Sequence, residues 1–207
     1  MALGTLSQMI SLTREEPDTA LADQALELAR ALRNNFGLMH ALMAVGVGRF
    51  RTEPSVAIPA LDEAVDRSAK LSRSVTLNQA YLFRGLAHLR LGHTEQAAKN
   101  LSAGVSHAYV SGNVYYVAIM LTAAAGMLSR HDSQQTAVVR MLAVADRLRH
   151  EAGLVGAPHD VATHLNITDR LRRTIGPTRF EQAWSLGRQT SLDEIVVLAR
   201  AELNELA

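Results

Sequence analysis

The amino-acid sequence predicts an all-α fold made of repeated pairs of antiparallel helices. Apolar residues recur at spacings of three and four along almost the whole chain, as they do on the buried face of an α-helix. Alternating, β-branched runs bounded by turn residues, which would indicate strands, are missing. Two series of small and bulky residues repeat about every 40 residues, which is typical of a stacked structural unit. The predicted architecture is an α-solenoid with a C-terminal helical cap.

The expected helices follow one another along the chain and are separated by glycine, proline, serine, threonine, asparagine or histidine. Their approximate limits are 19–34, 38–50, 56–71, 76–91, 94–110, 113–129, 134–151, 159–175, 178–188 and 192–205. At 207 residues, the chain has the length of one domain or of a short array of units. We expect residues 1–157 to form the helical repeats and residues 158–207 to form capping helices of the same domain.

The repeat is visible in two interleaved series of residues. In one series, a small residue is followed five positions later by a second small residue: Ala41 and Gly46, Ala80 and Gly85, Ala118 and Ala123. In the other, a leucine is followed three positions later by a small residue: Leu61 and Ala64, Leu101 and Gly104, Leu142 and Ala145. Two series with nearly the same period predict a helical hairpin that stacks on copies of itself, with small residues where backbones approach closely.

The central unit, Tyr81 to Gly104, resembles a tetratricopeptide repeat (TPR). The residues that carry the resemblance are Tyr81, Gly85, Leu91, Gly92, Ala97, Leu101 and Gly104, which fall at the spacings of that family. The sequence departs from the family at Arg84 and His88, where leucine and an aromatic residue are usual. Its period also exceeds the usual TPR period of about 34 residues. We therefore expect a TPR-like α-solenoid of antiparallel helix pairs.

Composition and motifs argue against several kinds of chemistry. A net charge of +1 is too small for a typical phosphate-backbone binder, and a chain without cysteine has no disulfide, thiolate nucleophile or zinc–thiolate site. The stretch from Gly46 to Arg49 lacks the third glycine, the lysine and the preceding strand of a phosphate-binding loop. No GxSxG or HExxH sequence is present. We expect a non-catalytic protein without a cofactor or metal.

Histidines provide the alternative hypothesis, an enzyme fragment with a metal site. His88 and His93, like His159 and His164, are five residues apart, which is about 140° around a helix. We therefore expect neither pair to face one metal ion. Asp160 next to His159 is explained by the start of a helix, where an acidic side chain is favourable. The enzyme hypothesis would assemble its site from His88, His159, Asp160 and His164.

Binding of a protein or peptide is the favoured class of function. Tyr109, Tyr115 and Tyr116 form the densest aromatic group, and exposed tyrosines commonly anchor partners. Arginines also gather on two predicted helices, at Arg147, Arg149, Arg170, Arg172 and Arg173. The acidic residues between them favour a solvated helix face, with recognition of an acidic peptide or a neighbouring domain as the functional alternative.

The C-terminal stretch FEQAWSLGRQTSLDE predicts a structural cap. Phe180 and Trp184 lie on a one-sided apolar stripe of a predicted helix. Ser191 and Glu194 have the spacing of a capping box, which satisfies backbone N–H groups at the start of the last helix. A solenoid needs such a lid over its terminal apolar face. We expect Trp184 to seal that end.

The same segment resembles the end of the helical-repeat region in actinobacterial LuxR-type and signalling-ATPase transcriptional regulators, and in related cyclases and kinases. The matching residues are Gly176, Pro177, Arg179, Phe180, Ala183, Trp184, Gly187, Arg188, Ser191, Leu192, Asp193 and Glu194. ATPase, cyclase and DNA-reading motifs are missing here, so the resemblance does not imply those activities. It implies partner binding or sensing that controls attached or associated output domains in transcription regulation and signal transduction.

The expected partners are a protein, a peptide, a small inducer or neighbouring domains of a larger regulator. Any contact with nucleic acid would be indirect. A free-standing adaptor protein is the alternative to a domain of a larger regulator. Whether the chain forms a homodimer stays open. The N-terminal residues lack the pattern of a signal peptide, and no stretch approaches a membrane span. We therefore expect a cytoplasmic protein that does not contact membranes.

Overall fold

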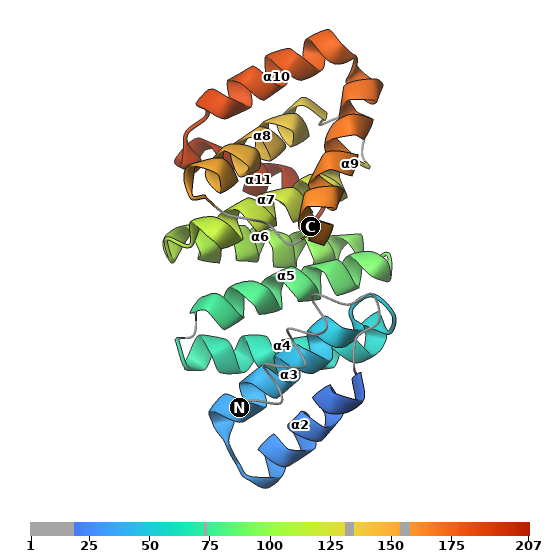
Figure 1. Ribbon diagram of the computed structural model, residues 1–207, viewed down its shortest axis with the longest axis vertical. Coiled ribbons are helices and arrows are strands. Elements are labelled where there is room, and N and C mark those ends of the chain that lie inside the picture. The colour runs from blue at the N-terminus through green and yellow to red at the C-terminus, as the bar shows by residue number, and fades with distance from the viewer. Residues whose placement is uncertain (1–18, 73, 131–134, 154–157) are drawn as a thin grey trace. The chain divides into compact units, whose positions relative to one another are not determined.

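The computed structural model describes residues 19–72, 74–130, 135–153 and 158–207, and within these residues it contains ten α-helices and no strand (Figure 1). The helices are α2 (Thr19–Ala31), α3 (Asn35–Arg49), α4 (Pro54–Lys70), α5 (Ser74–Arg90), α6 (Thr94–Val110), α7 (Val114–Leu128), α8 (Gln135–Glu151), α9 (Pro158–Ile175), α10 (Pro177–Gln189) and α11 (Leu192–Asn204). The all-α prediction is confirmed, and every helix end lies within three residues of its predicted position.

The chain divides into two compact units, which are described separately below. Unit 1 is Met1–Asn100 and unit 2 is Leu101–Ala207, so the division falls inside α6. The expected change from repeats to cap at 157/158 lies at the edge of residues 154–157, which are outside the described part of the chain. That boundary stays a prediction.

Alternate helices end in the same backbone turn. The second residue after each of them adopts a left-handed conformation, with φ near 50° to 65°: Arg33 after α2, Ser72 after α4, Gly112 after α6 and Gly153 after α8. These four positions follow one another at intervals of 39, 40 and 41 residues. The backbone thus repeats at the period that the side-chain pattern predicts.

Each fully described turn of this series closes one helix and starts the next with a single asparagine. The backbone N–H of Asn34 donates to the carbonyl of Ala29 in α2 at 3.1 Å, which is the bond of a Schellman cap. The side-chain oxygen of Asn34 then accepts from the backbone N–H of Gly37 at 2.9 Å, capping α3. After Gly112, the backbone N–H of Asn113 likewise donates to the carbonyl of Ala108, and its side-chain oxygen accepts from the backbone N–H of Tyr116. Only three residues are therefore needed to reverse the chain.

The repeated small and bulky residues lie in the core. All twelve members of the two series are buried except Ala123, which is half-buried. In unit 1, α2 packs on α3, α3 on α4 and α4 on α5. A Cβ atom built on Gly46 of α3 would lie 2.4 Å from Cδ2 of Leu61 in α4. The small residue therefore makes room for the fully buried leucine of the facing helix.

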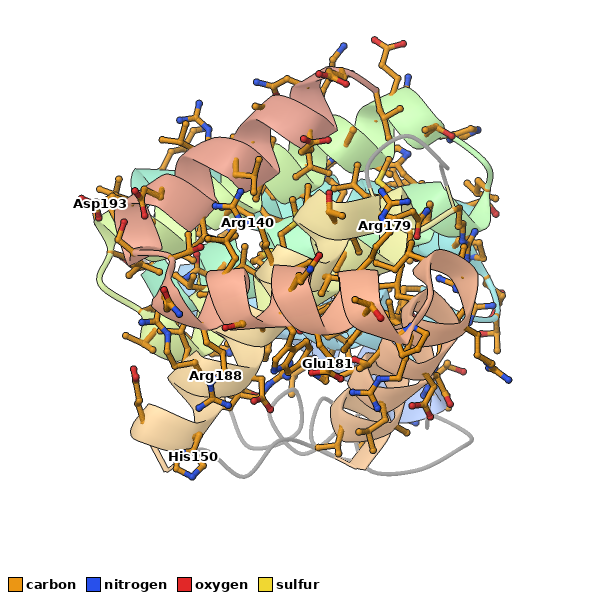
Figure 2. All side chains as sticks on the ribbon, turned by 90° about the horizontal axis from the view of Figure 1, so that it is seen from above. Arg140, His150, Arg179, Glu181, Arg188 and Asp193 are labelled. Carbon is orange, nitrogen blue, oxygen red and sulfur yellow. The ribbon has the colours of Figure 1, made fainter. Side chains whose placement is uncertain are left out.

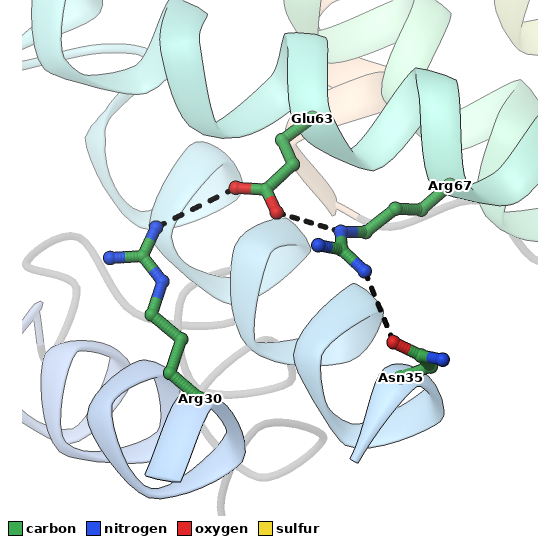
Figure 3. A network of polar contacts seen from close by, with 4 residues as sticks. All are labelled: Arg30, Asn35, Glu63 and Arg67. Carbon is green, nitrogen blue, oxygen red and sulfur yellow. Dashed lines mark hydrogen bonds and ion pairs between the residues drawn. The ribbon is translucent and has the colours of Figure 1, made fainter. Parts of the chain in front are cut away.

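A polar network on unit 1 links its first three described helices (Figure 3). Glu63 of α4 pairs with Arg30 of α2 at 3.5 Å and with Arg67 of its own helix at 2.7 Å. Arg67 also donates to the side-chain oxygen of Asn35, the first residue of α3, at 3.3 Å. These side chains are partly exposed, so each ion pair contributes at most about 1 kcal/mol. The network therefore adds little to the free energy of folding.

In unit 2, helix α8 packs mainly on α7 and α10, and much less on α9. A Cβ atom on Gly187 of α10 would lie 2.8 Å from both the Cβ atom of Ala143 and the Cα atom of Arg140 in α8. The backbones of α8 and α10 therefore touch at Gly187. Helix α9 contacts α7, α8 and α10 less extensively, and α11 contacts α7 and α8 less extensively.

No helix in the described part of the chain combines the length and the apolar character that a membrane span requires.

Candidate functional site

The three predicted partner-binding tyrosines have different environments in unit 2. Tyr115 is 37% exposed at the start of α7, whereas Tyr116 is only 7% exposed, and their rings meet edge to face at 5.2 Å. The half-buried Tyr109 donates its hydroxyl hydrogen to the carboxylate of Asp193 at 2.7 Å. This hydrogen bond is the main cause of the raised pKa of Tyr109. Because Tyr116 packs inward, Tyr115 is the tyrosine best placed to meet a partner.

Two valines extend the exposed surface at Tyr115. Val110 ends α6 and is 83% exposed, and Val114 begins α7 and is 36% exposed. Both are close to Tyr115 in sequence, on either side of the Gly112 turn. The turn between α6 and α7 thus presents apolar side chains where polar ones would be usual.

The start of α11 contains a capping box formed by Ser191 and Glu194. The hydroxyl of Ser191 accepts from the backbone N–H of Glu194 at 3.2 Å, and the Glu194 carboxylate accepts from the backbone N–H of Ser191 at 2.9 Å. Bonds from the Ser191 backbone and side chain lower the pKa of Glu194, and the charge of Arg140 acts in the same direction. These two residues therefore hold the last helix in place.

The apolar stripe of α10 packs through Phe180 more than through Trp184. Phe180 is 1% exposed, whereas Trp184 is half-buried and stacks on it, with ring centroids 5.5 Å apart. Trp184 also meets the ring of His164 from α9 edge to face at 6.3 Å. The tryptophan joins α9 to α10 inside unit 2. Its predicted role as the seal of a helical stack stays a prediction.

His164 is buried beside a guanidinium group. Its Nδ1 atom lies 3.1 Å from Nη1 of Arg149, and Arg149 Nη2 donates to the hydroxyl of Thr122 at 2.7 Å. Since arginine only donates, His164 accepts through Nδ1 and carries its hydrogen on Nε2. Burial, followed by the charge of Arg149, lowers the pKa of His164 to about 4, with Asp146 acting in the opposite direction. His164 is therefore neutral at physiological pH.

A groove of about 310 Å³ lies between α8 and α10. It is lined by Thr136, Ala137 and Arg140 from α8 and by Arg179, Gln182, Ala183 and Leu186 from α10. On α10, the lining residues come before Gly187. On α8, they come before Ala143, and Arg140 itself touches Gly187. The close crossing at Gly187 thus marks one end of the groove. We call it the α8–α10 groove.

The two long sides of α10 differ in how their charges are paired. Figure 2 shows Arg140 and Arg179 along one side of α10, and Glu181 and Arg188 along the other. On the second side, Glu181 pairs with Arg172 at 2.8 Å. No ion pair joins Arg140 or Arg179 to an acidic residue within the described ranges. The groove side therefore carries two arginines, of which Arg140 also acts electrostatically on the Glu194 carboxylate.

Arg140 reaches from α8 to the end of α10 and has one unsatisfied donor. Its Nη2 atom donates to the hydroxyl of Thr190 at 3.3 Å, which holds the guanidinium between α8 and the end of α10. Its Nε atom is buried and has no hydrogen-bond partner among the residues described. A buried donor without a partner is unfavourable by about 1–3 kcal/mol.

The expectation that His88 and His93 face apart was wrong. It assumed that one helix carries both residues, but α5 ends at Arg90 and the left-handed Gly92 turns the chain back. The Nδ1 atoms of His88 and His93 are consequently 3.4 Å apart. His93 is exposed and His88 half-buried, both in unit 1.

Of the four residues in the enzyme hypothesis, only His88 and His164 have described side chains. No group of three or more histidine, aspartate or glutamate side chains there could hold a metal ion. His88 belongs to unit 1 and His164 to unit 2, where Arg149 occupies the Nδ1 atom of His164. The side chains of His159 and Asp160 lie outside the described part of the chain.

Sequence reasoning missed the α8–α10 groove and the contact between the two histidines. Gly187 within the stripe of α10 was the available signal for a close helix crossing, and Gly92 was the signal for a reversal between His88 and His93. Comparison with protein-family models, curated proteins and solved structures found no match to this chain. Its function is therefore argued from its own geometry.

Proposed function

We propose that this chain is a TPR-like helical-repeat domain that binds a protein, a peptide or a small inducer within or beside a transcriptional regulator. The recurrence of one left-handed turn at Arg33, Ser72, Gly112 and Gly153 supports the repeat architecture. The likeness of the segment from Gly176 to Glu194 to LuxR-type regulators supports the regulatory context. The proposed role needs no cofactor and no catalytic residue.

The α8–α10 groove is the binding site that carries this proposal. Arg140 and Arg179 line it, and neither forms an ion pair with an acidic residue of the described ranges, although the charge of Arg140 acts on Glu194. Gln182 adds an amide that both donates and accepts. Guanidinium groups bind carboxylates through paired, charge-assisted hydrogen bonds. Leu186, which is 53% exposed, offers an apolar contact at the same place. The best-matched ligand is a peptide segment with acidic and apolar side chains.

Binding in this groove would act on a regulator by shifting a conformational equilibrium. A ligand that prefers one arrangement of the linked domains raises the population of that arrangement, without a chemical step. The repeat supplies the surface, and an attached or associated domain supplies the output. This mechanism distinguishes the proposal from an enzyme fragment.

Fluorescence anisotropy with short labelled peptides tests the site. A glutamate- and leucine-containing peptide should bind the full chain, and a lysine-containing peptide of the same length should not. Arg179→Glu should weaken binding of the acidic peptide by at least about tenfold, because it replaces a charge-assisted hydrogen bond by repulsion. Arg200→Glu is the matched control, since Arg200 is an exposed arginine of α11 that does not line the groove.

Two results would overturn the proposed site. The first is equal affinity of the acidic peptide for the unsubstituted chain and the Arg179→Glu variant. The second is a labelled DNA duplex that binds more tightly than the peptide and loses affinity steeply with salt, which would indicate direct nucleic-acid binding.

A further inference from the structure

The turn between α5 and α6 holds two imidazole rings side by side. The backbone N–H of His93 donates to the carbonyl of His88 at 3.0 Å, and that of Gly92 donates to Leu89 at 3.2 Å. These two bonds define a Schellman cap, in which the residue after the left-handed position regularly contacts the helix residue five positions earlier. Here both contacting residues are histidines. The backbone, not a chance rotamer, brings their side chains together.

The separation of the two rings suits a shared metal ion better than a hydrogen bond. Their Nδ1 atoms are 3.4 Å apart, beyond the usual range of about 2.7–3.2 Å for hydrogen bonds donated by nitrogen. Two nitrogens bound to one tetrahedral metal ion, each at about 2.0–2.1 Å, stand about 3.3–3.4 Å apart. His88 and His93 are thus already at the spacing of two ligands.

The surroundings keep the histidine pair available for a metal. An imidazole ring binds a metal ion through the lone pair of an unprotonated nitrogen. Arg84 lies one turn before His88 in α5, and Asp62 belongs to α4. Asp62 accepts from Arg84 at 2.9 Å, which offsets the arginine charge beside the rings.

We propose that His88 and His93 form a two-histidine binding site for a divalent transition-metal ion of the Zn²⁺, Ni²⁺ or Cu²⁺ type. Imidazole nitrogens favour these ions over Mg²⁺ and Ca²⁺, which take oxygen ligands. The described residues supply no third protein ligand, so water or a side chain of a bound molecule completes the coordination. The site lies in unit 1, whereas the α8–α10 groove belongs to unit 2.

Calorimetric titration of the full chain with ZnCl₂ near neutral pH tests the site. We expect saturable binding that His93→Gln weakens by at least about tenfold, because removal of one of two ligands leaves a single imidazole. His88→Gln should have the same effect. His150→Gln is the control, since His150 is an exposed histidine at the end of α8. MgCl₂ should give no binding.

His93→Gln keeps the test valid even if His88→Gln disturbs folding, because His93 is exposed in the turn. Nitrogen-15 NMR of the histidine rings supplies a second readout, in which Zn²⁺ should shift the ring nitrogens of His88 and His93 together. Absence of saturable zinc binding, or unchanged affinity after His93→Gln, would overturn the proposal. Zinc-induced shifts confined to other histidines would overturn it as well.

Discussion

At the scale of single residues, His164 shows how burial decides the charge state of a side chain. Its ring lies between Trp184 and Arg149, and its Nδ1 lone pair already accepts from the arginine. A proton on that nitrogen would remove the acceptor and place two positive groups 3.1 Å apart. The neutral ring is therefore part of the folded structure of unit 2.

This environment predicts a defined dependence of stability on pH. The pKa of His164 is about 4 in the folded chain and near 6.5 in the unfolded chain, so the unfolded chain binds the proton more tightly. The contribution of His164 to the free energy of unfolding is complete above pH 6.5 and is lost as the pH falls to 4. The loss amounts to about 3 kcal/mol.

Urea unfolding followed by circular dichroism between pH 7 and 4 checks this prediction. His164→Gln keeps a hydrogen-bond acceptor but does not titrate, so its stability should fall less over this range than that of the unsubstituted chain. Other groups titrate equally in both proteins, which makes their difference the informative quantity. Parallel stability curves for the two proteins would show that His164 does not carry the effect.

At the scale of elements, the left-handed turns use different residues at equivalent positions. Gly112 and Gly153 adopt a positive φ without steric conflict, whereas Arg33 and Ser72 carry a Cβ atom in the same conformation. A left-handed residue other than glycine is unfavourable by about 1–2 kcal/mol. The chain therefore stores backbone strain in the turns that follow α2 and α4.

Arg33→Gly should raise the free energy of unfolding by about 0.5–1 kcal/mol. Removal of the Cβ atom relieves the strained φ, and part of the gain is lost because glycine makes the unfolded chain more flexible. Arg33→Ala keeps the Cβ atom and should give no such gain, while Gly112→Ala should destabilise by a similar amount. Equal stability of Arg33→Gly and Arg33→Ala in denaturant unfolding would contradict this explanation.

Features that depend on adjacent residues were predictable from the sequence. The helices follow local apolar spacing, and the capping box needs only Ser191 and Glu194 three positions apart. The burial of Tyr116 depends on which face of α7 meets the core, and α7 is apolar on nearly all sides. The pairing of α8 with α10 depends on a crossing at Gly187 between distant segments. Helical spacing cannot supply such information.

At the scale of the whole molecule, the division between the two units falls within an uninterrupted helix. Helix α6 runs from Thr94 to Val110, while the units meet in sequence between Asn100 and Leu101. Melting of either half of α6 would remove helical hydrogen bonds that the other half uses. We therefore expect the two units to unfold together.

Gly46→Val and two spectroscopic probes test this cooperativity. The substitution places a branched side chain against the fully buried Leu61 in unit 1 and should cost about 1–3 kcal/mol. Circular dichroism reports all helices, whereas the fluorescence of Trp184, the chain's only tryptophan, reports unit 2. Both thermal midpoints should fall together, by about 2–4 °C per kcal/mol.

Ala69→Val is the matched control, because Ala69 is an exposed residue of α4. It introduces the same side chain without overpacking and should change both midpoints little. A lower midpoint by circular dichroism with an unchanged fluorescence transition would show that unit 2 unfolds on its own.

The contact at Gly187 also bears on the thermodynamics of ligand entry. Because the backbones of α8 and α10 already touch there, and Arg140 reaches Thr190 at the end of α10, the two walls of the α8–α10 groove are held before any ligand arrives. A ligand would then lose its own conformational freedom on binding but would not have to order the helices around it. The missing side chain of one glycine thus preorganises a binding surface several residues away.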